Sequence, residues 1–310
     1  MIISVVIPCF NVAKHIDDVV HGLPKDITWI IVVNDCSKDD TDAILLRLEK
    51  EDKRIIYIKH STNLGVGGAM LSGYRRSLEL QSDITIKMDG DGQMDPANIH
   101  QLIKPLLEDR AEFTKANRFR DFKALRAMPM SRRIGNIGLS FLIKAASGYW
   151  YIFDPTNGFT AIKNETLAGI DFGKIHKRYY FETSFLIELY YNNAVIIDIP
   201  MKARYGDEVS GLSRTQTLLE FPPKLLLALI KRVILKYFLF DFNIASLYIL
   251  CGTPIFIFGV VFGFINYLKY VTSHIAAPTG TVVIPTLLII LGFQLLLSAI
   301  SYDITNYPKK

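Results

Sequence analysis

The chain has 310 residues, which is enough for one large domain and an appendage. Its formal charge of +5, from 35 Lys and Arg against 30 Asp and Glu, is modest and gives no indication of nucleic-acid binding. Its three cysteines are widely spaced, so the sequence predicts neither a disulfide framework nor a zinc cluster.

Short β-branched runs alternate with amphipathic stretches in the first half of the chain. Strands are expected at 2–7, 29–33, 55–58 and 84–88, and helices at 15–23, 39–49 and 67–80. Alternation of this kind predicts an α/β domain with a mainly parallel, Rossmann-like sheet and helices on both faces. In the second half, strands are expected at 159–162 and 195–203, and a helix at 181–191.

Polar clusters follow three of the predicted strands, at 8–11, 34–37 and 89–91. Ligands of such sheets bind outside the carboxyl ends of the strands, so the three clusters predict one nucleotide-binding crevice. A glycine-rich segment at 63–69 precedes a predicted helix and could hold a phosphate or let the backbone approach a base. The residues assigned to a nucleotide are Pro8, Asn11, Asp35, Gly65, Gly68 and Asp89.

Asp35 allows two interpretations. Its carboxylate can accept hydrogen bonds from the imide edge of a pyrimidine or from a ribose, or it can cap the helix expected near Asp39. Contact with the nucleoside is favoured, because the first and fourth strand loops are expected to point to the same place.

Asp89, Gly90 and Asp91 follow an apolar strand, and Gln93 comes two residues later. Hard oxygen ligands at this spacing suit Mg²⁺ or Mn²⁺ bridging a diphosphate, although a lone Asp-x-Asp is also common in solvated turns. The strand-end setting favours a metal site formed by Asp89, Asp91 and Gln93. A metal there would neutralise the charge on a departing nucleoside diphosphate.

Basic residues gather between Ala111 and Arg133, directly after the acidic crevice. Such a run is often a solvated face, but its position here equally indicates a groove for an anionic acceptor. Guanidinium groups bind phosphate in a bidentate fork. The predicted acceptor-phosphate clamps are Arg118, Arg132 and Arg133, with Arg204 joining from a later loop.

Asp154 lies in the turn-rich segment 153–159 and could bring a carboxylate to the crevice. A hydroxyl acceptor would need it as a base, whereas a phosphate acceptor is already ionised, so that Asp154 would only position substrate or metal. A plain turn-forming role is the third interpretation.

The last third of the chain predicts a membrane anchor. Spans are expected near 244–268 and 281–302, within segments that lack Lys, Arg, Asp and Glu. An amphipathic stretch at 218–240 is expected to lie in the headgroup layer. Lys and Arg precede the first span and follow the second. This predicts an integral protein of the plasma (inner) membrane whose soluble domain and C-terminus lie in the cytoplasm. A pair of buried core helices is the weaker alternative.

The motifs together resemble family 2 glycosyltransferases with the GT-A fold, and in particular the dolichyl-phosphate mannose synthase and polyprenyl-phosphate glycosyltransferase group. The resemblance rests on the segments 6–11, 33–37, 63–69, 88–93, 154–159 and 180–182. It implies a GT-A domain at 1–213, a juxtamembrane helical segment at 214–241 and two membrane helices within 242–310. It implies catalytic roles for Asp91, Arg118 and Asp154.

The resemblance also implies an activity: inverting, metal-dependent transfer of a hexose from a UDP- or GDP-sugar to undecaprenyl or dolichyl phosphate. The expected partners are the nucleotide sugar, the polyprenyl phosphate and the bilayer, and a homo-oligomer is left open. One alternative is direct glycosylation of a hydroxyl on a polysaccharide or lipid-linked oligosaccharide. Another is a catalytically idle membrane scaffold, against which the intact Asp89, Asp91 and Gln93 set argues.

Overall fold

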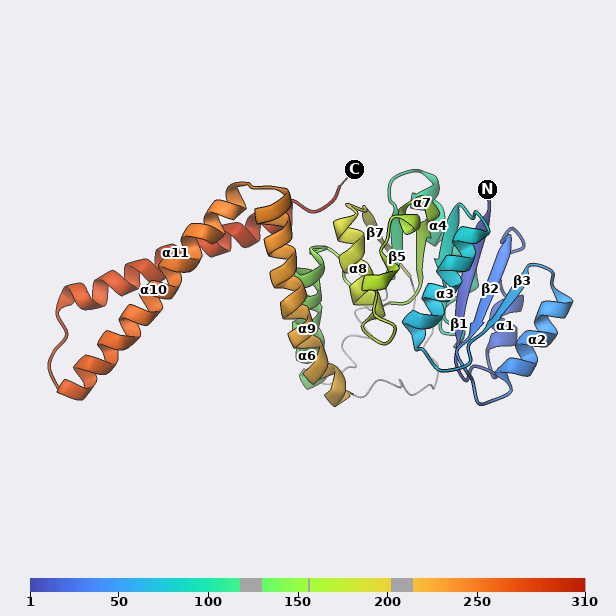
Figure 1. Cartoon of the computed structure of the whole chain (residues 1–310), viewed down its shortest axis with the longest axis horizontal. Coiled ribbons are helices and arrows are strands. Elements are labelled where there is room, and N and C mark those ends of the chain that lie inside the picture. The colour runs from blue at the N-terminus through green and yellow to red at the C-terminus, as the bar shows by residue number, and fades with distance from the viewer. Residues whose placement is uncertain (118–129, 156, 202–213, 310) are drawn as a thin grey trace. The chain divides into compact units, whose positions relative to one another are not determined.

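The computed structural model describes residues 1–117, 130–155, 157–201 and 214–309, without the side chains of 130–137 and 214–219. In these ranges one sheet has the strand order β3-β2-β1-β4-β6-β5-β7 (Figure 1). The strands are β1 (Ile3–Cys9), β2 (Trp29–Asn34), β3 (Ile55–Lys59), β4 (Ile84–Lys87), β5 (Phe113–Asn117), β6 (Thr160–Lys163) and β7 (Ile196–Pro200). Strand β6 runs antiparallel to β4 and β5, and the other pairs are parallel. The predicted mainly parallel α/β sheet is confirmed.

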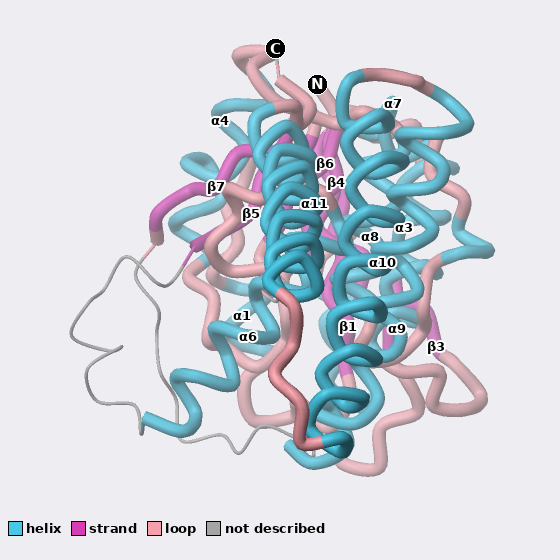
Figure 2. The backbone as a smooth tube through the Cα atoms, turned by 90° about the vertical axis from the view of Figure 1, so that its left-hand side faces the viewer, coloured by secondary structure: helices cyan, strands magenta, loops and turns pink. Residues whose placement is uncertain are grey.

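Helices cover both faces of this sheet (Figure 2). They are α1 (Ile16–His21), α2 (Thr41–Glu51), α3 (Val66–Glu79), α4 (Ile99–Leu107), α6 (Met130–Ser147), α7 (Asn164–Ala168) and α8 (Phe181–Tyr191), with short 3₁₀ turns at Pro96–Asn98 and Phe172–Lys174. Alternate residues of β1 feed two cores, because successive side chains of a strand point to opposite faces. Val5 and Ile7 pack with residues of α1, α2 and α4, whereas Val6 packs with residues of α3, α7 and α8.

The sequence located the strands of the first half and several helices, but it missed β5 and the helices α4, α6 and α7. The predicted helix at 181–191 coincides with α8, and the four predicted strands of the first half are present. In β5, Thr114, Lys115 and Asn117 are all buried, so the strand carries no apolar alternation that would reveal it.

The chain divides into two compact units, one of Met1–Leu226 with Pro308–Lys310 and one of Leu227–Tyr307. Helix α9 (Arg214–Ile234) runs from the first unit into the second, where a π-helical segment, Leu235–Phe240, continues it. The predicted boundary at residue 213 stays a prediction.

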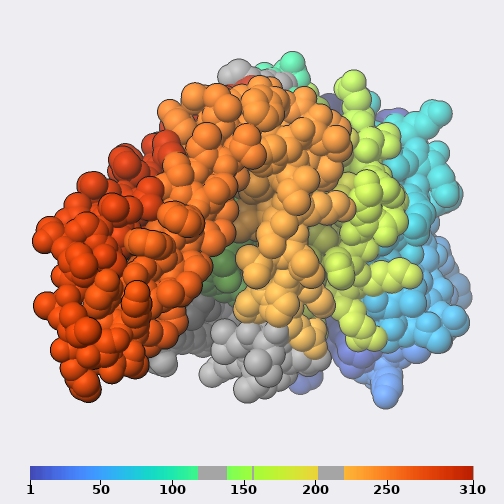
Figure 3. Space-filling model, turned by 60° about the vertical axis from the view of Figure 1, so that its left-hand side comes forward, coloured from blue at the N-terminus to red at the C-terminus, as the bar shows by residue number. Residues whose placement is uncertain are grey.

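Two long helices of the second unit, α10 (Ile244–Ser273) and α11 (Thr279–Thr305), are long and apolar enough to cross a membrane, with mean hydropathies of 2.2 and 2.4. They lie side by side (Figure 2), and large apolar side chains are exposed along both (orange to red in Figure 3). Small residues let the two backbones approach: a Cβ at Gly292 would lie 2.6 Å from the Phe256 nitrogen.

A buried ion pair joins α9 to the end of α11 within the second unit. Arg232, only 1 % exposed, makes two parallel hydrogen bonds to the Asp303 carboxylate, of 2.8 and 2.7 Å. The Tyr237 hydroxyl donates to the same carboxylate, and Lys236 Nζ lies 3.8 Å from it. Arg232, which the sequence placed among the headgroup-facing cations, is therefore buried and paired.

We expect Asp303→Ala to destabilise the second unit strongly, because it leaves the Arg232 guanidinium buried without its counter-charge. The loss is about 3–5 kcal/mol, the range found when one partner of a buried pair is removed. Thermal unfolding in detergent micelles measures it. Glu220→Ala, which removes an exposed partner of Lys224, is the control and should barely change the melting temperature. Equal melting temperatures for the two variants would contradict this role of the pair.

Candidate active site

Three loops meet at the carboxyl ends of β1, β2 and β4, as the sequence predicted. Asn11, in the left-handed region at φ 55°, accepts a hydrogen bond of 2.8 Å from the Lys38 backbone N–H. The Asn11 backbone N–H donates to the Ser37 hydroxyl at 3.0 Å. These two bonds hold the loop after β1 against the loop after β2. Pro8 is half-buried and Asn11 is exposed, so Asn11 is the more accessible of the two at the carboxyl end of β1.

Asp35 organises the glycine-rich segment. Its buried carboxylate accepts the backbone N–H groups of Leu64 and Gly65, at 2.8 and 2.7 Å, and lies 2.8 Å from His60 Nδ1. The His60 Nε2 lies 2.9 Å from the hydroxyl of Ser72 on α3. Asp35 does not cap α2, whose N-cap residue is Asp40. Contact between Asp35 and a nucleoside stays a prediction. In the structure the Asp35 carboxylate holds the glycine-rich segment through Leu64 and Gly65.

The glycines of this segment are required by a neighbouring loop. Gly65 has φ +85°, and a Cβ there would lie 2.7 Å from the Lys177 carbonyl oxygen. The Gly68 N–H donates to that same oxygen at 3.0 Å. A Cβ at Gly67 would lie 2.3 Å from the His176 carbonyl. The glycines therefore allow a close approach of the loop 176–178, and the two roles that the sequence left open, holding a phosphate and approaching a base, stay predictions.

The Asp-Gly-Asp loop rests on a buried lysine. Lys87, the last residue of β4, is 2 % exposed and places its Nζ 2.7 Å from Asp89 Oδ1 and 3.6 Å from Glu182 Oε1. Burial lowers the pKa of the Lys87 ammonium, but the negative charges of Asp89 and Glu182 outweigh it and keep the pKa above its ordinary value. Lys87 is therefore a permanent cation beneath the loop.

The donor set of this loop suits a metal that also binds a diphosphate. Asp89, Asp91 and Gln93 are all half-buried, and Asp91 Oδ1 accepts the Gln93 backbone N–H at 3.0 Å. Among the residues that the structure describes, no three His, Cys, Asp or Glu side chains converge into a metal cluster. The loop thus offers two carboxylates and an amide oxygen, and Mg²⁺ in proteins commonly takes one or two carboxylates with substrate phosphates completing its coordination.

The segment around Asp154 packs directly on that loop. A Cβ at Gly158 would lie 2.4 Å from Asp89 Oδ2 and 2.3 Å from Lys87 Nζ, so a glycine is needed for this approach. Asp154 is fully buried and accepts a hydrogen bond of 3.2 Å from the Asn157 amide. The predicted delivery of Asp154 to the region of the Asp-Gly-Asp loop is thus consistent with the chain path from 154 to 158.

A second buried lysine lies behind this segment. Lys115 of β5 donates to the Asn157 carbonyl oxygen. Burial lowers the pKa of Lys115 to about 8, against the opposing effect of the Asp154, Glu182 and Asp198 charges. Burial also raises the pKa of Asp198 to about 6, although its carboxylate accepts the Phe153 N–H at 2.8 Å. Near pH 7 the Lys115 and Asp198 side chains therefore both carry their charges.

Sequence reasoning missed Lys87, Lys115 and Glu182 as parts of the site. The available signal was a lysine in each of two otherwise buried strands, at the carboxyl end of β4 and in the middle of β5, where an unpaired charge is too costly to persist. The predicted acceptor residues Arg118 and Arg204 lie outside the described residues. Arg132 and Arg133 belong to the first turns of α6, whose side chains are not described.

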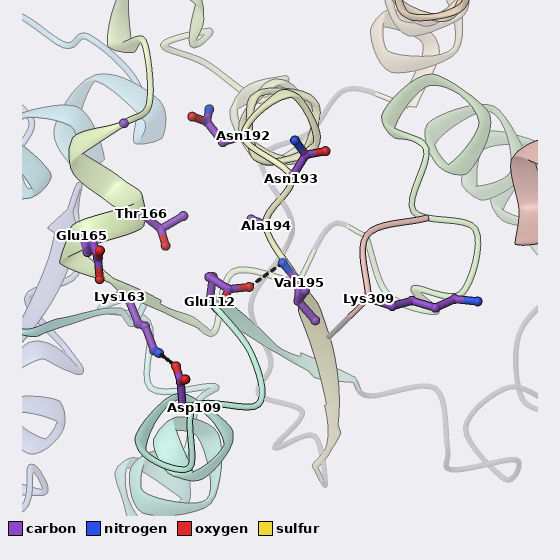
Figure 4. A pocket seen from close by; sticks show the side chains of 11 residues that line it. Asp109, Glu112, Lys163, Glu165, Thr166, Asn192, Asn193, Ala194, Val195 and Lys309 are labelled. Atoms are coloured by element: carbon purple, nitrogen blue, oxygen red, sulfur yellow. Dashed lines mark hydrogen bonds and ion pairs between the residues drawn. The ribbon is translucent and has the colours of Figure 1, made fainter. Parts of the chain in front are cut away.

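A polar cavity of about 560 Å³ lies at the opposite edge of the sheet (Figure 4). Lys163 and Ile84 are register partners, so the cavity wall formed by Lys163 adjoins the start of β4 rather than its carboxyl end. Lys163 pairs with Asp109 there, and Glu112 accepts the Val195 N–H at 2.7 Å. These internal pairs make the cavity part of the sheet's support, away from the crevice.

Comparison with known proteins connects this arrangement to a family. Residues 4–182 match the family model described as "Glycosyl transferase family 2". The chain is 33 % identical over 219 residues to a UDP-N-acetylglucosamine--dolichyl-phosphate N-acetylglucosaminyltransferase of Methanococcus voltae, covering 66 % of this chain and 87 % of that protein. It is 26 % identical to a polyprenol monophosphomannose synthase of Mycolicibacterium smegmatis, covering 64 % and 75 %.

A solved structure shares the fold at low sequence identity. Glucosyl-3-phosphoglycerate synthase from Mycobacterium tuberculosis, in complex with Mn²⁺, UDP and phosphoglyceric acid, superposes with a TM-score of 0.55 at 17 % identity, covering 74 % of this chain and 78 % of that one. The family match at residues 4–182 includes the loops after β1, β2 and β4. The chain belongs to glycosyl transferase family 2.

Proposed function

We propose that this family 2 member transfers a sugar from a nucleotide-sugar donor to a polyprenyl phosphate, with Mg²⁺ or Mn²⁺ bound at the Asp-Gly-Asp loop. The observation that carries the proposal is the combination of that loop, resting on buried Lys87, with two helices long enough to anchor the chain where a polyprenyl phosphate resides. The named relatives support the acceptor class. The two relatives are named for different sugars, N-acetylglucosamine and mannose, so we propose only the donor class, a UDP- or GDP-hexose.

In the proposed reaction an oxygen of the lipid phosphate attacks the anomeric carbon of the donor sugar. The bond from that carbon to the nucleoside diphosphate breaks as the new bond forms, the leaving group takes the electron pair, and the configuration inverts. Asp89, Asp91 and Gln93 would hold the metal, which neutralises charge on the leaving diphosphate. Lys87 keeps the Asp89 carboxylate in place, and Gly158 lets the acceptor-side segment close on it.

The proposed topology places the first unit and the C-terminus on the cytoplasmic side, because Lys and Arg flank the helix pair there. Lys224, Lys231 and Lys236 precede α10, and Lys309 and Lys310 follow α11, whereas the connector between the helices holds no basic residue after Lys269 apart from His274. In this arrangement the first unit would take its nucleotide sugar from the cytoplasm. The lipid-linked product would then serve a later step across the membrane.

We expect purified protein with Mg²⁺ or Mn²⁺ to transfer label from a UDP- or GDP-hexose to undecaprenyl phosphate, and Asp91→Asn to reduce the rate by on the order of 10²-fold or more. Asp95→Asn is the matched control. Its carboxylate caps the 3₁₀ turn at Pro96–Asn98 by accepting the Ala97 N–H, outside the metal set. A wild-type protein inert toward every polyprenyl phosphate would refute the function. Near-normal turnover by Asp91→Asn, with chelator still inhibiting, would refute only the metal assignment.

Gly158→Ala should weaken Mn²⁺ binding, because the added methyl group displaces Asp89 or Lys87. We expect an affinity loss of about tenfold, equivalent to about 1.4 kcal/mol. Electron paramagnetic resonance of free Mn²⁺ reports the dissociation constant without any turnover. Gly138→Ala on α6, where a Cβ meets nothing within 4 Å, is the control and should bind like wild type. An unchanged affinity in Gly158→Ala would mean that Asp89 is not positioned by this contact.

Asp154→Asn distinguishes the two acceptor classes. A phosphate oxygen is ionised before it attacks, so with polyprenyl phosphate the variant's rate should barely change with pH above about 7. A hydroxyl acceptor must lose a proton, and removal of its base costs on the order of 10²- to 10⁴-fold, with recovery as pH rises. Asp198→Asn is the control, since it also removes a carboxylate beside Lys115. If high pH restores the rate of Asp154→Asn but not that of Asp198→Asn, the acceptor is a hydroxyl group and not a phosphate.

A further inference from the structure

An aromatic surface lies directly before Asp154 in the chain. Phe141 and Phe153 are 56 % and 64 % exposed, and Trp150 is half-buried. The rings of Phe141 and Trp150 meet edge to face at 5.6 Å, and Lys144 Nζ lies 4.8 Å from the Phe153 ring centroid. Because Phe141 and Lys144 are three residues apart on α6, they share one face of the helix. We call Phe141, Lys144, Trp150 and Phe153 the aromatic patch.

The patch stands on a rigid base. Between and beside its members, Ala145, Ala146, Tyr149 and Ile152 are buried. The Tyr149 hydroxyl donates to the Ala194 carbonyl oxygen at 2.6 Å. The exposed rings of Phe141 and Phe153 therefore belong to a segment whose neighbouring residues are packed into the core.

The composition of the patch identifies its partner. A single exposed aromatic residue is ordinary, but three aromatic side chains with a lysine in one turn and one loop match the residues that anchor proteins at membrane interfaces. Lysine is depleted from the cores of protein interfaces, which disfavours a second copy of the chain as the partner. At a bilayer the Lys144 ammonium can instead reach anionic headgroups while the rings enter the interfacial layer.

Tethering makes a weak contact sufficient. The first unit is joined through α9 to helices of membrane-spanning length, which keeps its surface at high effective concentration near the bilayer. We propose that the aromatic patch docks on the lipid headgroup layer and brings the Asp154 side of the crevice to the bilayer surface. The benefit to catalysis rests on the proposed function, because the phosphate of a polyprenyl phosphate lies in the headgroup layer. The docking itself does not depend on the proposed function.

The chain's two tryptophans give a direct test on the full protein. Trp29 begins β2, at the edge of the sheet opposite the crevice, and Trp150 belongs to the patch. Two variants, Trp29→Phe and Trp150→Phe, each leave one reporter. Both are reconstituted in vesicles of phosphatidylcholine and phosphatidylglycerol, with and without acyl chains brominated near the headgroup. We expect about a twofold loss of Trp150 emission in the brominated vesicles and little loss for Trp29, because interfacial Trp rings lie near the upper acyl chain.

Three other outcomes would overturn the docking. They are equal quenching of both reporters, no quenching of Trp150, and quenching of Trp150 that appears only after undecaprenyl phosphate is added. The last would assign the patch to the isoprenoid chain of the acceptor.

A kinetic comparison separates docking from the proposed function. Phe141→Ser should raise the apparent KM for undecaprenyl phosphate in vesicles severalfold and leave the KM for the nucleotide sugar unchanged. Leu107→Ser, which changes a similarly exposed apolar residue at the end of α4, is the control and should alter neither. Quenched Trp150 in a protein that never uses polyprenyl phosphate would refute the function and keep the docking. Transfer to polyprenyl phosphate with Trp150 unquenched would do the reverse.

Discussion

Lys87 ends strand β4 with its ammonium group buried between Asp89 and Glu182. A charge in that position persists only with partners, and the partners come from two places, the Asp-Gly-Asp loop and the start of α8. The ion pairs therefore fix the loop relative to the helix that packs behind the sheet. Gly158 then brings a third segment onto the same pair of charges. The Asp-Gly-Asp loop, α8 and the segment that contains Gly158 thus meet at one buried cation.

Much of this architecture was predictable because it follows local rules. Short β-branched runs located β1 and β2, and the strand-end rule placed the Asp-Gly-Asp loop at the carboxyl end of β4. Helices α10 and α11 followed from uninterrupted apolar composition. Each of these inferences uses only residues that are neighbours in the chain.

The features that escaped prediction depend on residues far apart in the sequence. The buried Lys115 ammonium donates a hydrogen bond to the Asn157 carbonyl oxygen and lies near the negative charge of Asp198. Both partners are far from Lys115 in the sequence, so no local pattern predicts its burial. Arg232 has the sequence context of a headgroup-facing cation, yet it is buried against Asp303, which comes 71 residues later in the chain, near the end of α11. The same reasoning applies to β5, where Lys115 and Asn117 are buried with long-range partners, so the strand lacks an apolar signature.

Counting the buried charges gives a physical reason for a cation at the crevice. The ammonium groups of Lys87 and Lys115 face four carboxylates, those of Asp89, Asp154, Glu182 and Asp198. Acidic groups thus outnumber basic ones in this cluster even before Asp91 is included. A diphosphate donor brings more negative charge, and repulsion between like charges is strong where water is scarce. A divalent cation bound by Asp89 and Asp91, as we propose, would turn that repulsion into attraction. Under the proposed function, positive charge would be needed again for the acceptor phosphate, and the chain has a dense run of Arg and Lys in the stretch that follows β5.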